Sequence, residues 1–64
     1  MAYRNLGQHE KALSNYEQAL SIYREIGNRR GEGDILGNIG LVYHSLGQND
    51  KALSYFEQSL VIMR

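Results

Sequence analysis

Residues 42–64 read VYHSLGQNDKALSYFEQSLVIMR, and residues 2–24 read AYRNLGQHEKALSNYEQALSIYR. The two stretches lie forty residues apart and align without a gap, and 13 of the 23 aligned positions are identical. Self-similarity at such a period is typical of arrays in which each repeat is one supersecondary unit stacked on its neighbours. The repeat therefore favours a surface that holds other proteins over an enzyme with a single active site.

A second regularity lies inside the first. Gly7, Gly27 and Gly47 are twenty residues apart, and each follows a leucine or an isoleucine. Glycine just past a helix end adopts the left-handed conformation without a Cβ clash. We therefore expect each half-period to be one helix with its stop signal, and two halves to form a helix–turn–helix repeat.

Apolar residues recur at steps of three and four along most of the chain, which predicts amphipathic helices. The expected fold class is all-α, with three main helices over residues 9–26, 29–46 and 49–64 and a residual helical turn in residues 1–6. Asn28 is the expected N-cap of the second of these helices. Residues 1–26 then form a partial first repeat and residues 28–64 a second, about one and a half repeats in a single domain.

The composition restricts the classes of partner. Seven basic residues balance seven acidic ones, so the formal net charge is zero. Nucleic acids and anionic membranes require a basic surface, and we expect neither as a partner. No apolar run approaches the roughly 20 residues of a membrane span, and the first residues do not resemble a targeting peptide. The expectation is a soluble protein, with the cytoplasm favoured although no residue specifies the compartment.

Two sets of residues carry a resemblance to a known family. Residues 37–48 read GNIGLVYHSLGQ, and KAL follows at 51–53 and YFEQSL at 55–60. The partial first copy carries Tyr3, LG at 6–7, KAL at 11–13 and YEQAL at 16–20. Together they cover essentially the whole chain and resemble the tetratricopeptide repeat (TPR). The forty-residue period is similar to the longer-helix branch of spindle-orientation adaptors, kinesin light chains and bacterial multi-repeat proteins.

The resemblance implies an antiparallel helix–turn–helix solenoid and assigns packing roles. Gly40 and Ala52 match positions where the two helices of a hairpin cross closely. Ala19 matches the site where the next hairpin packs, and its counterpart Ser59 is a mild departure that exposure to solvent would accommodate. The residues expected to pack the repeats are Leu6, Ala12, Tyr16, Ala19, Leu20, Leu36, Ile39, Gly40, Tyr43, Ala52, Phe56 and Leu60.

The resemblance also implies a concave groove, lined by the first helix of each repeat, that binds extended or helical peptides. Asn38 matches an asparagine that clamps a peptide main chain in many relatives, a task for which an amide can donate and accept at once. Leu41, His44, Asp34 and Ser45 are further groove candidates. The alternative for each of them is ordinary solvated surface.

The sequence contains no residue pattern that favours a catalytic site. His9 and His44 lie on different predicted helices and not at a metal-binding spacing such as i, i+4. Ser14 and Ser54 occupy equivalent repeat positions, which indicates a scaffold because a unique active site would break the repeat. The glycines of residues 31–40 do not match a phosphate-binding loop. We expect no enzyme activity, no cofactor and no metal.

The partial repeats leave apolar stripes facing water, and such patches drive association. We expect a homo-oligomer with a dimer favoured, formed by end-to-end stacking or by straightening of the loop at residues 27–31 and exchange of helices between chains. The leading hypothesis is a non-catalytic scaffold that binds a protein or peptide. The alternative is an engineered or excised repeat fragment made for assembly or folding study, with no ligand of its own.

Overall fold

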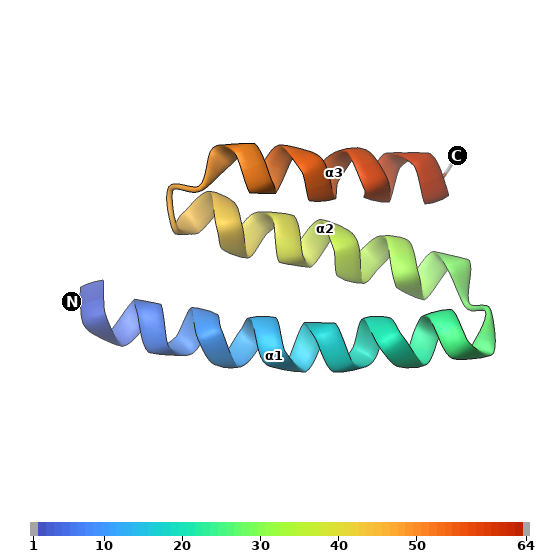
Figure 1. Ribbon diagram of the computed structural model, residues 1–64, viewed down its shortest axis with the longest axis horizontal. Coiled ribbons are helices and arrows are strands. Elements are labelled where there is room, and N and C mark those ends of the chain that lie inside the picture. Colours follow the sequence, from blue (N-terminus) through green and yellow to red (C-terminus); the bar gives the residue numbers. More distant parts are fainter. Residues whose placement is uncertain (1, 64) are drawn as a thin grey trace.

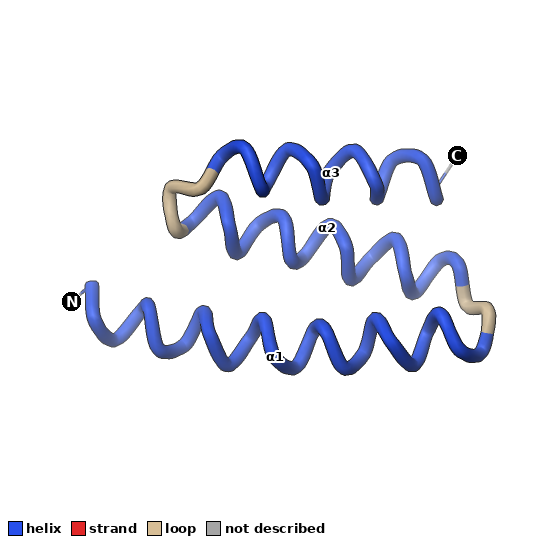
Figure 2. The backbone as a smooth tube through the Cα atoms, viewed as in Figure 1, coloured by secondary structure: helices blue, strands red, loops and turns tan. Residues whose placement is uncertain are grey.

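A computed structural model of the chain describes the backbone of residues 2–63 and the side chains of residues 7–62. It contains three helices, α1 (Ala2–Ile26), α2 (Arg29–Ser45) and α3 (Asn49–Met63), shown in Figure 1. Two short connections join them, as Figure 2 shows in tan. The predicted all-α fold is confirmed, and α2 and α3 end within one residue of their predicted bounds.

The helices lie side by side and alternate in direction, with α2 between α1 and α3 (Figure 1). Over the described residues 2–63, α2 packs against both neighbours, whereas the backbones of α1 and α3 stay apart. The molecule measures 38 × 21 × 11 Å along its principal axes. Because the arrangement is this flat, α1 and α3 each keep a long outer face that no other helix of the structure covers.

The first two helices end as the glycine spacing predicts. Gly27 and Gly47 have φ values of 72° and 78°, in the left-handed region. The N–H of Asn28 donates to the Tyr23 carbonyl at 2.8 Å, and the N–H of Gln48 donates to the Tyr43 carbonyl at 2.9 Å. This pattern is the Schellman motif, in which glycine lets the backbone reverse and satisfy the last carbonyls of the helix.

The connection between α1 and α2 is short, as the predicted start of the second helix at residue 29 requires. The Asn28 side chain accepts a hydrogen bond of 2.9 Å from the Gly31 N–H, which confirms Asn28 as the N-cap of α2. Helix α2 therefore begins at Arg29, and the loop expected over residues 27–31 contains only Gly27 and Asn28. The cap satisfies an amide of the first turn and thereby extends the helix towards the glycine.

The prediction of a stop at Gly7 is wrong. Helix α1 runs without interruption from Ala2 through Gly7 to Ile26, so residues 2–6, the described part of the expected turn over residues 1–6, belong to α1. The same Leu-Gly-Gln tripeptide ends a helix at Gly47. A reversal at Gly47 lets α2 and α3 bury apolar surface against each other. Continuing α1 keeps its backbone hydrogen bonds at no loss of packing.

This difference predicts opposite effects of one substitution. Gly7→Ala should stabilise the fold by about 0.5–1 kcal/mol, because Gly7 is helical and nothing lies within 4 Å of an added Cβ. Gly47→Ala should destabilise it by about 1–2 kcal/mol, because alanine is strained at positive φ. Urea denaturation followed by circular dichroism measures both changes. A destabilising Gly7→Ala would contradict a helical residue 7.

The core lies on the face of α2 that both neighbours reach. Leu20 of α1 and Leu36 and Ile39 of α2 are buried, and the last two are only 1% exposed. Partly buried side chains surround them: Leu13, Tyr16, Ile35, Tyr43, Tyr55 and Ile62. A core this small leaves most of the chain near solvent, as expected for a short chain.

Helices α2 and α3 cross closely at Gly40. A Cβ on Gly40 would lie 2.7 Å from the Phe56 ring and 3.2 Å from the Ala52 carbonyl oxygen. Ala52 is itself 2% exposed. The small residues at this crossing therefore let the two backbones approach more closely than larger side chains would allow.

Ser59 does not face solvent, contrary to the sequence-based expectation. Its Oγ donates a 2.8 Å hydrogen bond to the Gly33 carbonyl oxygen of α2. The hydroxyl therefore belongs to the α2–α3 crossing, where the glycines of α2 expose their backbone to a side-chain donor. The side chain of Leu6, another expected packing residue, lies outside the described side chains.

Candidate functional site

Four of the five groove candidates form one row along α2. Asp34, Asn38, Leu41 and Ser45 are separated by four, three and four residues, so they lie on successive turns of one helix face. Asn38 is half-buried and the other three are exposed, with Leu41 at 56%. The row lies opposite the buried residues Leu36 and Ile39 and combines an acidic, an amide, an apolar and a hydroxyl side chain.

The Asn38 amide is available for a ligand. Among the described side chains, none forms a hydrogen bond with it. It carries one acceptor oxygen and two donor hydrogens, which is the set that a peptide main chain presents in complementary form. The row could therefore bind backbone through Asn38 and an apolar side chain through Leu41.

His44 lies apart from this row. Its Nδ1 is 3.2 Å from Oδ1 of Asn49, at the start of α3. Between these two helices is a shallow, mainly apolar pocket lined by His44, Asn49, Ala52, Leu53 and Phe56. The structure thus groups the fifth candidate with α3 residues that the sequence did not assign to a site.

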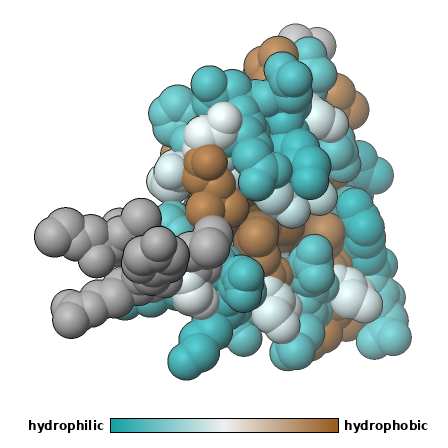
Figure 3. Space-filling model, turned by 60° about the vertical axis from the view of Figure 1, so that its left-hand side comes forward, coloured by the Kyte–Doolittle hydropathy of each residue, from teal (hydrophilic) through white to brown (hydrophobic). Residues whose placement is uncertain are grey.

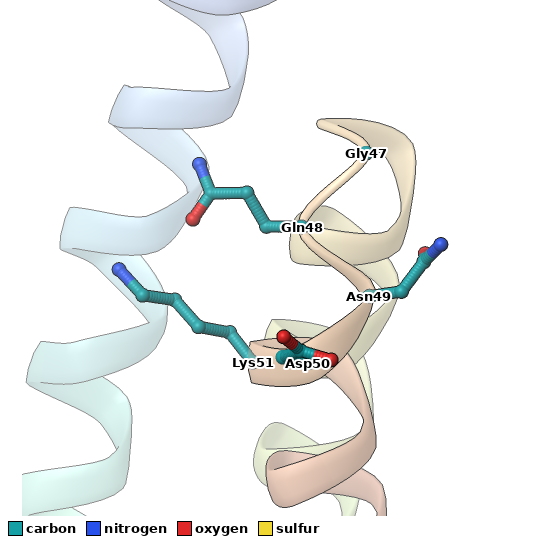
Figure 4. A pocket seen from close by; sticks show the side chains of 5 residues that line it. All are labelled: Gly47, Gln48, Asn49, Asp50 and Lys51. Atoms are coloured by element: carbon teal, nitrogen blue, oxygen red, sulfur yellow. The ribbon is translucent and has the colours of Figure 1, made fainter.

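A second pocket lies at the turn between α2 and α3, lined by Gly47, Gln48, Asn49, Asp50 and Lys51. Figure 4 shows Gln48 and Lys51 pointing from the turn towards the neighbouring helix α1. Nothing in the sequence analysis identified this pocket, which forms where the chain turns from α2 into α3.

Lys51 lies over one ring of a stacked pair of tyrosines. Its Nζ lies 5.3 Å from the centroid of the Tyr43 ring, a cation–π contact. The Tyr43 ring also stacks on Tyr55, with centroids 5.5 Å apart and an interplanar angle of 11°. These tyrosines pack between helices, as the apolar stripe of α2 predicts for Tyr43, and so are not positioned as stacking groups for nucleic-acid bases.

At the other end of the molecule an ion pair joins α1 to α2. Arg24 Nε donates to Glu32 Oε2 at 3.0 Å, with the two side chains 52% and 18% exposed. A pair this exposed contributes little to stability. Both members of the ion pair line a surface depression. The rest of its lining comes from α3: Ser54, Glu57, Gln58, Val61 and Ile62.

Several large apolar side chains face solvent on the outer helices. Leu53 and Leu60 of α3 are 59% and 61% exposed, and Ile22 and Ile26 of α1 are 56% and 65% exposed. Figure 3 shows isolated hydrophobic side chains near the top of the molecule and a larger hydrophobic group across its middle. Leu60 was expected to pack between repeats, but none of the three described helices covers its side chain.

The part of the chain that the structure describes offers no group of three or more His, Cys, Asp or Glu residues able to hold a metal ion. The same residues include no helix with the length and apolar character needed to cross a bilayer.

Comparison with known protein families finds a match that covers the chain. The family model described as tetratricopeptide repeat matches residues 1–64, the whole chain. The chain belongs to the tetratricopeptide repeat family. None of the curated proteins and none of the solved structures compared with it matches.

Membership of the TPR family assigns the chain to a class of protein–protein interaction modules that are typically non-catalytic scaffolds. Three packed helices are consistent with a piece of a TPR array. Two exposed surfaces stand out among the described side chains of this TPR chain. One is the mixed polar row on α2, and the other is the apolar outer face of α1 and α3.

Proposed function

We propose that this TPR chain is a non-catalytic scaffold that binds an extended or helical peptide of a partner protein on the exposed face of α2. The observation that carries the proposal is the row of Asp34, Asn38, Leu41 and Ser45 on consecutive turns, with the Asn38 amide unoccupied by other described side chains. In this proposal residues 1–26 are a partial first repeat, residues 28–64 are a second, and α2 is the groove-lining helix of the second repeat.

The chemistry of the row suits a peptide. A main-chain amide unit offers one donor and one acceptor, and Asn38 can satisfy both. Leu41 adds an apolar contact for a side chain of the peptide. Recognition of this kind works by shape and hydrogen-bond complementarity and involves no bond making or breaking.

Replacement of Asn38 by alanine tests the groove. For the peptides that the wild-type chain enriches from a random library, Asn38→Ala should weaken binding by about 2- to 10-fold, the worth of one or two hydrogen bonds. Fluorescence anisotropy with each enriched peptide measures the change. The matched control is Asn15→Ala, which removes an exposed asparagine from α1. Equal effects of the two variants, or no enriched peptide, would contradict a groove on α2.

A second candidate function is self-association, and the exposed apolar residues of the outer helices favour it. Leu53 and Leu60 on α3 and Ile22 and Ile26 on α1 lie at the two edges of the molecule, where a second copy can cover them. A closed homodimer covers the apolar residues of both helices, whereas end-to-end stacking leaves those at the ends of the stack exposed. With only Gly27 and Asn28 between α1 and α2, exchange of helices requires this short turn to straighten.

Static light scattering at micromolar protein concentration tests self-association. We expect a molar mass of about twice the 7.3 kDa chain. A folded monomer under these conditions would contradict it. The variant Leu60→Glu should shift the mass towards the monomer, because it places a charge in the apolar surface that the dimer would bury.

A further inference from the structure

The row of side chains on α2 extends one turn further towards the start of the helix. Arg30 precedes Asp34 by four residues, so it lies on the same face as Asp34, Asn38 and Leu41. Arg30 and Asp34 are both exposed. Along α2 this face therefore presents a cation, an anion, an amide and an apolar side chain, in that order.

The two charges at the start of this order are open to a ligand. Neither Arg30 nor Asp34 forms an ion pair or a side-chain hydrogen bond with another described residue. A basic residue four positions before an acidic one is also the less favourable order for pairing within a helix. Opposite charges from outside the chain can therefore pair with both side chains.

The spacing of these side chains matches that of an extended peptide. Four residues of an α-helix advance about 6 Å along its axis. Two residues of an extended chain advance about 6.6 Å, and their side chains point to the same side. Alternate residues of an extended peptide that runs along α2 can thus lie opposite successive side chains of the row.

The Asn38 amide favours an extended peptide over a helical one. In a helical peptide the main-chain N–H and C=O groups are already hydrogen-bonded to one another, except at the two ends. An extended peptide leaves these groups free, so the Asn38 side chain can both donate to it and accept from it.

We propose that α2 selects an extended peptide that carries both signs of charge. An acidic residue of the peptide lies opposite Arg30, a basic residue lies opposite Asp34, and an apolar residue lies opposite Leu41. This inference rests on the proposed peptide site of α2 and adds which peptides that site prefers. A uniformly acidic peptide would be repelled by Asp34, and a uniformly basic one by Arg30.

Labelled peptides of nine residues are the probes, and each is tested against the full chain. The complementary peptide has glutamate at its second position, lysine at its fourth, leucine at its seventh and eighth, and threonine elsewhere to favour an extended backbone. The exchanged peptide has the same composition, with the glutamate and the lysine interchanged. Each peptide is also made in reverse order, because the Asn38 amide can serve a main chain of either direction.

We expect the complementary peptide, in one of its two directions, to bind about 3- to 10-fold more tightly than the exchanged peptide of the same direction. Fluorescence anisotropy measures both affinities. A ratio of this size corresponds to two ion pairs at exposed positions. The ratio should fall as sodium chloride is raised, because salt screens exposed charges.

A charge reversal in the chain tests which residue sets the preference. Asp34→Lys should bind a peptide with glutamate at both charged positions more tightly than it binds the complementary peptide. The matched control Glu10→Lys makes the same change of charge at an exposed position of α1 and should keep the wild-type preference. Circular dichroism verifies that both variants stay helical.

Three results would overturn the inference: no saturable binding of any of these peptides, no preference for the complementary peptide in either direction, or a preference that survives Asp34→Lys. Equal loss of the preference in Glu10→Lys would also overturn it, because the effect would then follow the total charge of the chain. The proposed site can stand when the inference fails. Library peptides that depend on Asn38 but show no charge preference contradict the inference alone, whereas binding that does not depend on Asn38 contradicts the proposed site.

Discussion

Leu36→Ala is expected to remove a large part of the free energy of unfolding of the protein. The Leu36 side chain is 1% exposed and lies in the core between all three helices. Truncation to alanine removes buried methyl groups and leaves a cavity, at a cost of about 2–5 kcal/mol. A domain of this length has a total free energy of unfolding of only about 3–10 kcal/mol. A single substitution can therefore remove most of the stability.

Urea denaturation monitored by circular dichroism at the helix band measures this loss. The matched control is Leu41→Ala in the same helix, where the leucine is 56% exposed. It should change the free energy of unfolding by no more than about 0.5 kcal/mol. If the two variants lose similar amounts of stability, the core does not lie where the structure places it.

The second large effect is expected at the closest crossing of α2 and α3. Gly40→Ala adds a Cβ that would lie 2.7 Å from the Phe56 ring and 3.2 Å from the Ala52 carbonyl oxygen. The half-buried ring can shift, but the backbone oxygen moves only with the helix. Overpacking of this kind costs about 1–3 kcal/mol and outweighs the roughly 1 kcal/mol that alanine adds to helix propensity.

Gly37→Ala, one turn earlier, is the control. Its added Cβ would meet only Ser59 Oγ at 3.5 Å, an ordinary contact. Helix propensity should then dominate, and the variant should gain up to about 1 kcal/mol. Thermal and urea denaturation of the pair should give changes of opposite sign. A Gly40→Ala variant more stable than wild type would show that the helices do not cross at this glycine.

Several features of the fold follow from local sequence. The positive φ of Gly27 and the Asn28 cap depend on residues within one turn of each other, and the chain predicts both. The apolar periodicity likewise predicts the buried faces of α2, including Leu36 and Ile39. Local signals suffice here because the competing conformations differ in hydrogen bonds and backbone strain within a few residues.

The candidate surfaces were predictable only in part. The row from Asp34 to Ser45 follows from helical spacing, so the sequence predicts that these residues share a face. The position of His44 beside Asn49 and Phe56 does not, because it depends on how α2 lies against α3. The pocket at Gln48 and Lys51 likewise depends on the way the chain turns from α2 into α3. Spacing within one helix is local, whereas contacts between helices require the packed chain.

The sequence alone predicts a set of amphipathic helices with glycine stops, because periodicity and caps are properties of neighbouring residues. Its resemblance to the tetratricopeptide repeat is confirmed by the family match over residues 1–64. Only the tertiary structure decided which equivalent positions of the two repeats differ in backbone conformation or in burial. The tripeptide Leu-Gly-Gln reverses the chain at Gly47 and continues a helix at Gly7. Leu20 is buried and Leu60 is exposed. In each pair the residues are the same, and the outcome depends on whether another helix is present to bury apolar surface against them.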